Sequence, residues 1–397
     1  MWPRPFRRRT GVVRCLLAVL LVGALGCGAL ACAPTRSEPG VARPEAAPSG
    51  SAAPTAREDD GRPSCAAVVA ALPVRARLAQ RLVVGVDAAE PAMVVRLVER
   101  TQVGGVFVAG MATALLRDQA LRQVQAVARI PVSVAVDDEG GRVQRVETLD
   151  GRIPSARRMA ATMTPDEVRE LARNRGAALA ARGITVNYAP VVDLTGSSPA
   201  IGDRAFGSDP DTVTRYAEAF IAGMRDAGIT TVLKHFPGHG RADGDSHRRR
   251  VTTPHLDELR RADLRPYTAL VGPGGPAADG RTAVMVGHLD VPGLTDGLPT
   301  SLSPAAYRLL REEIGFRGLV LTDDLGAMKA VSARFDLPEA VVRALAAGAD
   351  VALWSSGGRV DEILTALERA LSGGRLDAGE NDRAVARVLA AKGHCRG

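Results

Sequence analysis

Short β-rich runs alternate with longer stretches of helical periodicity along most of this chain, and that alternation limits the fold more than any other feature. A helix between two strands returns the chain to the starting edge of the sheet, so successive strands run parallel. The runs with strand composition are residues 81–86, 104–109, 132–137, 185–192, 231–235, 283–288, 319–323 and 350–354. Eight such units predict an α/β fold, a single-domain (β/α)8 barrel of the TIM type.

The alternative is an open doubly wound sheet, but no glycine fingerprint of the dinucleotide type follows the first strand. A capping box with proline at the first helical position, residues 164–167, predicts a helix start between the third and fourth strands. Barrel chemistry sits at the carboxyl ends of the strands. The polar residues that end or follow a strand there are Asp137, Asn187, Lys234, His235, His288 and Asp323.

Residues 1–32 predict export. Arginines at positions 7–9 precede an apolar stretch over 15–31, which is typical of a signal peptide. Cys27 and Cys32 each follow a small residue and resemble the cysteine of a lipoprotein cleavage box, with Cys32 preferred as the lipidated residue. Ordinary cleavage, an uncleaved membrane anchor and a twin-arginine route stay open. The expected location is the outer face of the cell membrane, or outside the cell.

Residues 33–63 predict a disordered tether, because prolines recur among alanine, serine and glycine, and Val41 is the sole large aliphatic residue. The catalytic domain is therefore expected over 64–397. The formal charge of +7 includes five arginines within residues 1–32, where there is no acid, so the rest of the chain carries +2. That small excess argues against a nucleic-acid partner.

The densest run of ionisable residues is Lys-His-Phe-Pro-Gly-His-Gly at 234–240, followed by Asp-Ser-His at 245–247. It permits a metal cluster, a sugar site with an Asp-His pair, or histidines that only cap a turn. The metal cluster would use His235, His239, Asp245 and His247. Proline and glycine at 237–238 break any helix that would align the first two histidines, so no metal is predicted, and no cofactor.

Five segments together resemble the bacterial β-N-acetylglucosaminidases of glycoside hydrolase family 3. They are residues 136–145, 201–207, 234–240, 245–247 and 321–325, and the resemblance extends over roughly residues 77–354. It implies a TIM-type barrel that removes terminal N-acetylglucosamine from peptidoglycan fragments. One local departure follows the last segment, where two residues rather than one precede Met328.

By this resemblance Asp323 is the nucleophile of a retaining glycosidase, with Asp324 as the rival and a helix N-cap as the other role for one of the pair. His247 is the acid/base and Asp245 orients it, on a loop expected to move. An imidazole suits proton transfer because its unperturbed pKa is about 6.5. The alternative is that His247 belongs to a basic run, residues 247–250, that faces solvent.

The resemblance assigns the sugar hydroxyls to Asp137, Arg145, Arg204, Lys234 and His235. The arginines could instead be salt-bridge partners, and the aspartate could cap a turn. Lys234 is harder to dismiss, since it is one of three lysines among 51 basic residues and an ammonium is a compact donor. His288 and Asn187 are interpreted as rim residues, and Trp354 as either a sugar platform or packing.

The cysteine count predicts a disulfide. If Cys15 leaves with the signal and Cys32 is lipidated, Cys65 and Cys395 remain in an oxidising compartment, at the two ends of the domain. Three functions stay open: an exo-acting retaining glycosidase on peptidoglycan saccharides, a metal-dependent hydrolase on a similar barrel, and a non-catalytic wall-binding lipoprotein. The first is favoured, and the sequence gives no oligomeric state.

Overall fold

The computed structural model describes residues 61–396. The predicted signal (1–32), its Cys27 and Cys32, and nearly all of the predicted tether (33–63) lie outside the described residues. Over 61–396, no helix combines the length and the apolar character needed to cross a membrane.

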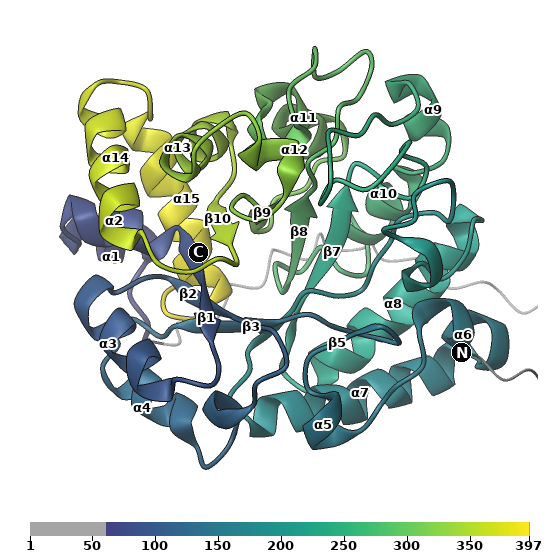
Figure 1. Cartoon of the computed structure of the whole chain (residues 1–397), viewed down its shortest axis with the longest axis horizontal. Coiled ribbons are helices and arrows are strands. Elements are labelled where there is room, and N and C mark those ends of the chain that lie inside the picture. Colours follow the sequence, from purple (N-terminus) through teal and green to yellow (C-terminus); the bar gives the residue numbers. More distant parts are fainter. Residues whose placement is uncertain (1–60, 397) are drawn as a thin grey trace, which may run out of the picture. The chain divides into compact units, whose positions relative to one another are not determined.

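Eight parallel strands close into a barrel in the order β1-β10-β9-β8-β7-β6-β3-β2, which confirms the predicted (β/α)8 fold (Figure 1). The barrel strands are β1 (Leu82–Asp87), β2 (Gly105–Ala109), β3 (Ser133–Val136), β6 (Val186–Asn187), β7 (Thr230–Phe236), β8 (Thr282–Val286), β9 (Val320–Asp324) and β10 (Val351–Trp354). The barrel closes where β1 pairs with β10, with Leu82 opposite Ala352. A separate antiparallel pair, β4 (Asp138–Gly140) and β5 (Val143–Gln144), follows β3.

Helices surround the barrel, as Figure 1 shows. They are α1 (Cys65–Ala71), α2 (Val74–Gln80), α3 (Pro91–Thr101), α4 (Ala120–Ala126), α5 (Glu147–Asp150), α6 (Ala156–Thr162), α7 (Pro165–Ala181), α8 (Pro210–Asp226), α9 (Leu256–Arg261), α10 (Arg265–Val271), α11 (Pro304–Arg308), α12 (Lys329–Ser332), α13 (Leu337–Ala347), α14 (Val360–Ser372) and α15 (Ala378–Ala391). Short turns of other helix types are η1 (Ala114–Leu116), η2 (Gly202–Arg204), η3 (Thr300–Leu302) and η4 (Leu309–Glu313).

Alternation along each strand divides the core into two layers. In β1, Leu82, Val84 and Val86 belong to the large cluster between the strands and the helices, while Val83 points into the barrel. The barrel interior is filled by side chains of this second kind, including Phe107, Ala135, Tyr188, Val232, Ala283, Met285, Leu321, Val351 and Leu353. The barrel is therefore a packed core.

The fourth predicted strand, 185–192, is wrong in length, since β6 holds only Val186–Asn187. The Ala189 N–H turns back to the Asn187 carbonyl, and Pro190 has no N–H to give to a ladder. The predicted start of α7 is confirmed: the Thr164 hydroxyl accepts from the Glu167 N–H, and the Glu167 carboxylate accepts from the Thr164 N–H.

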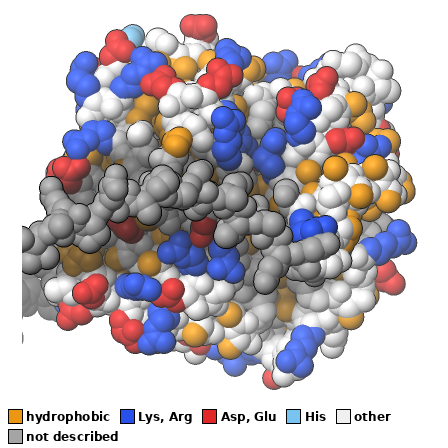
Figure 2. Space-filling model, turned by 180° about the vertical axis from the view of Figure 1, so that it is seen from behind, with side chains coloured by type: hydrophobic (Ala, Val, Ile, Leu, Met, Phe, Trp, Pro, Cys, Tyr) orange, Lys and Arg blue, Asp and Glu red, His pale blue; other side chains and the backbone are white. Residues whose placement is uncertain are grey.

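The two ends of the described chain meet beside α15. Cys65 and Cys395 form a disulfide across 330 residues, as the cysteine count predicted, and the Cys65 N–H donates to the Arg396 carbonyl at 2.8 Å. Around them Val69, Val385 and Leu389 form a small apolar cluster. Over the surface seen in Figure 2, basic and acidic side chains are mixed, in keeping with the small net charge of the domain.

Candidate active site

A cavity of about 660 Å³ opens at the carboxyl ends of the barrel strands. Its wall contains all eight residues predicted for catalysis and sugar binding: Asp137, Arg145, Arg204, Lys234, His235, Asp245, His247 and Asp323. They come from β7 and β9 and from the segments after β3, β6 and β7. The barrel thus gathers in one cavity residues that are far apart in the sequence.

Lys234, on β7, is the centre of a buried charge network. Its ammonium donates to Asp137 Oδ1 and lies 2.6 Å from Glu139 Oε1, while Arg204 donates to both oxygens of Glu139 at 2.7 and 2.8 Å. Burial alone would lower the pKa of Lys234, but the two carboxylates raise it. Burial would also raise the pKa of Glu139, and the two cations instead hold it well below its usual range. Lys234, Glu139 and Arg204 are therefore charged, and these contacts fix all four groups in position.

Asp323 and Asp324 end β9 but have different surroundings. Asp323 lines the cavity and accepts one hydrogen bond, from the Asp324 N–H at 2.8 Å. Burial favours its neutral form, but the histidines His235, His288 and His247 together with that hydrogen bond lower its pKa to about 2. Asp324 instead accepts from the N–H groups of Gly326, Ala327 and Ser355 and from the Ser355 hydroxyl. Asp324 is thus occupied in holding two loops, whereas Asp323 is ionised and open to the cavity.

Asp193, fully buried after β6, fixes the histidines of the segment that follows β7. Its carboxylate lies 2.7 Å from His235 Nδ1 and accepts the His239 N–H at 2.6 Å. Burial would raise its pKa, but these two histidines lower it. The glycine at 240 is needed for this close path, because a Cβ there would lie 1.6 Å from the Leu194 carbonyl oxygen.

His239 links this anchor to the loop that carries the predicted acid/base. Its two ring nitrogens lie 2.8 Å from the Ser246 hydroxyl and 3.1 Å from the Ser198 hydroxyl. Burial and the neighbouring His235 lower the pKa of His239. A neutral ring can donate to one hydroxyl and accept from the other, so His239 acts as a bridge between two loops.

Asp245 and His247 form a pair on that loop. His247 Nδ1 lies 2.7 Å from Asp245 Oδ1, and the His247 N–H donates to the same oxygen at 2.9 Å. Burial would raise the pKa of Asp245, but its hydrogen bonds with His247 lower it, which keeps the carboxylate ionised. The imidazole side chain is 60% exposed, and its Nε2 has no partner within residues 61–396. The solvent-facing alternative is therefore partly right, although the ring also lines the cavity.

Arg145 and two aromatic rings complete the wall. The Nε of Arg145 is buried without a hydrogen-bond partner in the described chain, so this guanidinium has donors left for a ligand. Phe107 and Tyr188 stack with their ring centroids 5.4 Å apart and also line the cavity.

The remaining candidates have structural partners. His288 is bonded to the Ser301 hydroxyl and the Asp324 carbonyl, and Asn187 is bonded to the backbone of Asp138. Trp354 is fully buried, so packing, not sugar stacking, accounts for it. Over residues 61–396, no three metal-ligating side chains group together. The histidines of the proposed metal cluster bond to Asp193, Ser198, Ser246 and Asp245 instead.

Sequence reasoning missed Glu139 and Asp193. Glu139 stands two residues after Asp137 in the segment 136–145, and its closeness to a strand end is the signal that could have identified it. Asp193 follows the two valines at 191–192 near the predicted fourth strand end. Nothing local distinguishes it from a turn cap, because its role depends on β7 lying beside it.

Comparison with known proteins agrees with this geometry. The sequence matches the family model described as "Glycosyl hydrolase family 3 N terminal domain" over residues 74–391. It is 49% identical over 337 residues to Beta-hexosaminidase LpqI of Mycobacterium tuberculosis, covering 83% of this chain and 85% of that one. The structure of M. tuberculosis LpqI superposes with a TM-score of 0.79 at 48% identity, over 83% of this chain and 97% of that one. A family 3 β-N-acetylglucosaminidase from Paenibacillus sp. FPU-7 gives 0.74 at 31% identity, over 82% and 63%.

The Glu139 network makes a prediction about stability. Changing Glu139→Gln leaves two buried cations without part of their counter-charge, so the free energy of unfolding at pH 7 should fall by about 3–5 kcal/mol. Because the folded-state pKa of Glu139 lies below its usual 4.5, the carboxylate's contribution is complete above that pH and is lost as the pH falls below it. The measurement is urea unfolding of both proteins from pH 7 down to about pH 3, which reaches into the range where the contribution is lost.

The matched control is Asp203→Asn, which removes the exposed carboxylate 2.9 Å from Arg142. An exposed pair contributes less than about 1 kcal/mol, so this variant should stay close to the parent. Equal losses in the two variants would contradict the buried-network interpretation.

Proposed function

The chain belongs to glycosyl hydrolase family 3 and is a β-hexosaminidase of that family, and from this premise we propose that it releases terminal N-acetylglucosamine from peptidoglycan fragments through a covalent glycosyl-Asp323 intermediate. The observation that carries the mechanism is the contrast between the two strand-end carboxylates. Asp323 is ionised, open to the cavity and accepts a single hydrogen bond, whereas Asp324 is occupied by four donors. A retaining glycosidase needs such a fixed carboxylate to attack the anomeric carbon.

The second half of the mechanism rests on the loop pair. Asp245 holds His247 through Nδ1 and so directs Nε2 outward as the proton carrier. In the first step Nε2 gives its proton to the leaving oxygen while Asp323 forms the glycosyl bond. In the second step Nε2 takes a proton from water, which displaces Asp323 and restores both groups.

The neutral sugar fits a cavity in which two of the cations are already paired with acids. Lys234 and Arg204 are held by acids, so they can give hydrogen bonds to hydroxyls without an anionic partner in the substrate. The guanidinium of Arg145 offers the sugar a further N–H donor, because its Nε has no hydrogen-bond partner in the described chain. The support for peptidoglycan as the source is the predicted export signal, since the cell wall is where an exported enzyme of this specificity meets N-acetylglucosamine.

The experiment for the substrate is digestion of purified wall fragments, with the released sugar identified by mass spectrometry and its anomer by NMR. We expect N-acetylglucosamine, released first as the β-anomer, with the rate unchanged by a chelator. No released sugar from wall fragments, with turnover of a chromogenic N-acetylglucosaminide, would overturn the substrate. Loss of that turnover on chelation would favour the metal-dependent alternative, and no turnover at all the non-catalytic one.

Changing Asp323→Ala should lower turnover by about 10⁴-fold or more and leave the fold intact, because the covalent route is lost. A 2-fluoro sugar probe should label the peptide that contains Asp323 in the parent enzyme. Label on Asp324, or an oxazoline formed from the substrate's own acetamido group, would contradict this assignment.

Changing His247→Ala should slow hydrolysis of substrates with poor leaving groups by about 100-fold or more, the usual contribution of general acid catalysis. Glycosylation by activated aryl glycosides needs no proton and should slow far less, and Asp245→Asn should give the same pattern more weakly. His255→Ala removes an exposed histidine outside the cavity and is the control, with rates near the parent. Equal loss for all leaving groups, with an unchanged pH profile, would show that another group transfers the proton.

A further inference from the structure

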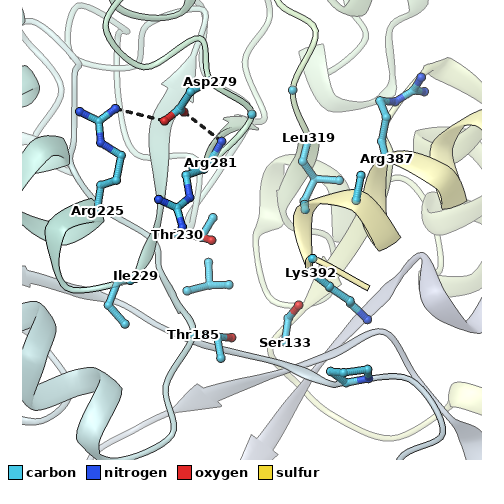
Figure 3. A pocket seen from close by; sticks show the side chains of 18 of the residues that line it. Ser133, Thr185, Arg225, Ile229, Thr230, Asp279, Arg281, Leu319, Arg387 and Lys392 are labelled. Atoms are coloured by element: carbon cyan, nitrogen blue, oxygen red, sulfur yellow. Dashed lines mark hydrogen bonds and ion pairs between the residues drawn. The ribbon is translucent and has the colours of Figure 1, made fainter. Parts of the chain in front are cut away.

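A second cavity, of about 630 Å³, lies at the opposite end of the barrel, where the strands begin. We name it the basal pocket: it is lined by residues 131–133, 185–186, 228–230, 279–281, 317–319 and 390–393, with Arg62, Arg225 and Arg387. Ser133 opens β3, Thr230 opens β7, Arg281 precedes β8, and Lys392 follows α15 (Figure 3). None of the proposed catalytic groups contributes to it.

The wall of this pocket carries an excess of positive charge. Its cations are Arg62, Arg225, Arg281, Arg317, Arg387 and Lys392, against the single acid Asp279. Asp279 is already paired with Arg225 at 3.1 Å. Arg387 lies 2.8 Å from Asp350, a carboxylate that also pairs with Arg311 at 2.7 Å. Both acids near the pocket, Asp279 and Asp350, therefore already have cationic partners.

Lys392 is the most informative of these cations. Its ammonium has one partner in the described structure, the neutral amide oxygen of Gln80 at 2.7 Å, and no carboxylate. Burial lowers its pKa to about 7, so a bound anion would favour its charged form. An ammonium has three donors, so two are left for a ligand in the pocket.

Two guanidinium groups of the wall also lack an acidic partner. Neither Arg281 nor Arg317 forms a side-chain ion pair within residues 61–396, and the charge of Arg317 is one cause of the lowered pKa of Arg311. Figure 3 shows Arg281 and Lys392 on opposite sides of the pocket, with the hydroxyl groups of Ser133 and Thr230 between them. The three cations belong to the segments before β8, before β9 and after α15, so they line the pocket from three different elements.

We propose that the basal pocket binds a tetrahedral oxyanion of the phosphate class, held by Arg281, Arg317 and Lys392. A planar carboxylate presents two oxygens in one plane, whereas a phosphate accepts from donors that converge from several directions. Arginine forks and a lysine point charge are the side chains that recognise phosphate in proteins. The volume lies in the range of small-molecule sites, so the phosphate can carry an organic group.

The test is calorimetric titration of the full chain with two probes at constant ionic strength: inorganic phosphate, and glycerophosphoglycerol, which is the phosphodiester headgroup of an anionic lipid. We expect saturable binding of one equivalent with a dissociation constant of about 1 mM or lower. Tighter binding of the first probe identifies free phosphate as the source, and tighter binding of the second a lipid headgroup. Sodium acetate should bind at least about tenfold more weakly, because two oxygens cannot engage the three walls.

The variants are the double change R281Q/R317Q and the single change Lys392→Met, each expected to weaken phosphate binding by about tenfold or more. Arg158→Gln, an exposed arginine of α6 outside the basal pocket, is the matched control and should bind like the parent. All three should retain turnover of a chromogenic N-acetylglucosaminide, which reports an intact barrel. No saturable binding, equal binding of acetate, or the same weakening in the control would each overturn the proposal.

Discussion

The arrangement of the active site depends on the buried carboxylate of Asp193. It receives a hydrogen bond or charge contact from His235 and from the backbone of His239, and its ionised form is retained in spite of complete burial. Removing a buried charge from water is costly unless the charge is paired and hydrogen-bonded, so these contacts have to be made together. Asp193 thereby fixes both His235, which lines the active-site cavity, and His239, which bonds to Ser246. The position of the loop that carries Asp245 and His247 depends on this bond.

The two proposed catalytic groups differ in how firmly the fold holds them. Asp323 ends a strand of the closed barrel and is fixed by β8 and β10 on either side. His247 stands on a loop, more than half exposed, and its loop is attached through His239 and through backbone bonds from Lys329 and Ala330 to its carbonyl groups. A nucleophile must stay positioned for attack on one carbon atom, whereas an acid/base must contact the leaving oxygen and then an incoming water molecule. Rigid placement of the first and looser placement of the second suit those tasks.

Local patterns were sufficient for the barrel and for the cavity wall, because alternation and strand-end chemistry are properties of short segments. Local patterns were not sufficient where the length of a strand or the role of a side chain depends on a segment that is distant in the sequence. The pairing of the fourth strand is interrupted at Ala189 and Pro190 and resumes only as a single bridge between Val191 and Lys234, although the sequence around it has strand composition. Glu139 compensates the charges of Lys234 on β7 and of Arg204 before α8, and Asp193 is bonded to His235 and His239, so the importance of the two acids appears only when those segments meet. Trp354 gave no local sign of which side of the barrel wall it would face.

The two ends of the barrel differ in how their cations are paired with acids. At the catalytic end Lys234 and Arg204 each contact a carboxylate, so the cavity offers hydrogen-bond donors while its charge stays balanced, as a neutral sugar requires. At the basal end the nearby acids form ion pairs with Arg225, Arg311 and Arg387. Two other guanidinium groups of the wall line a cavity of similar volume without an acid of their own within residues 61–396. The convergence of these cations on one cavity wall, together with a lysine that has no acidic partner in the described chain, means that several positive charges would attract an anion bound in the basal pocket.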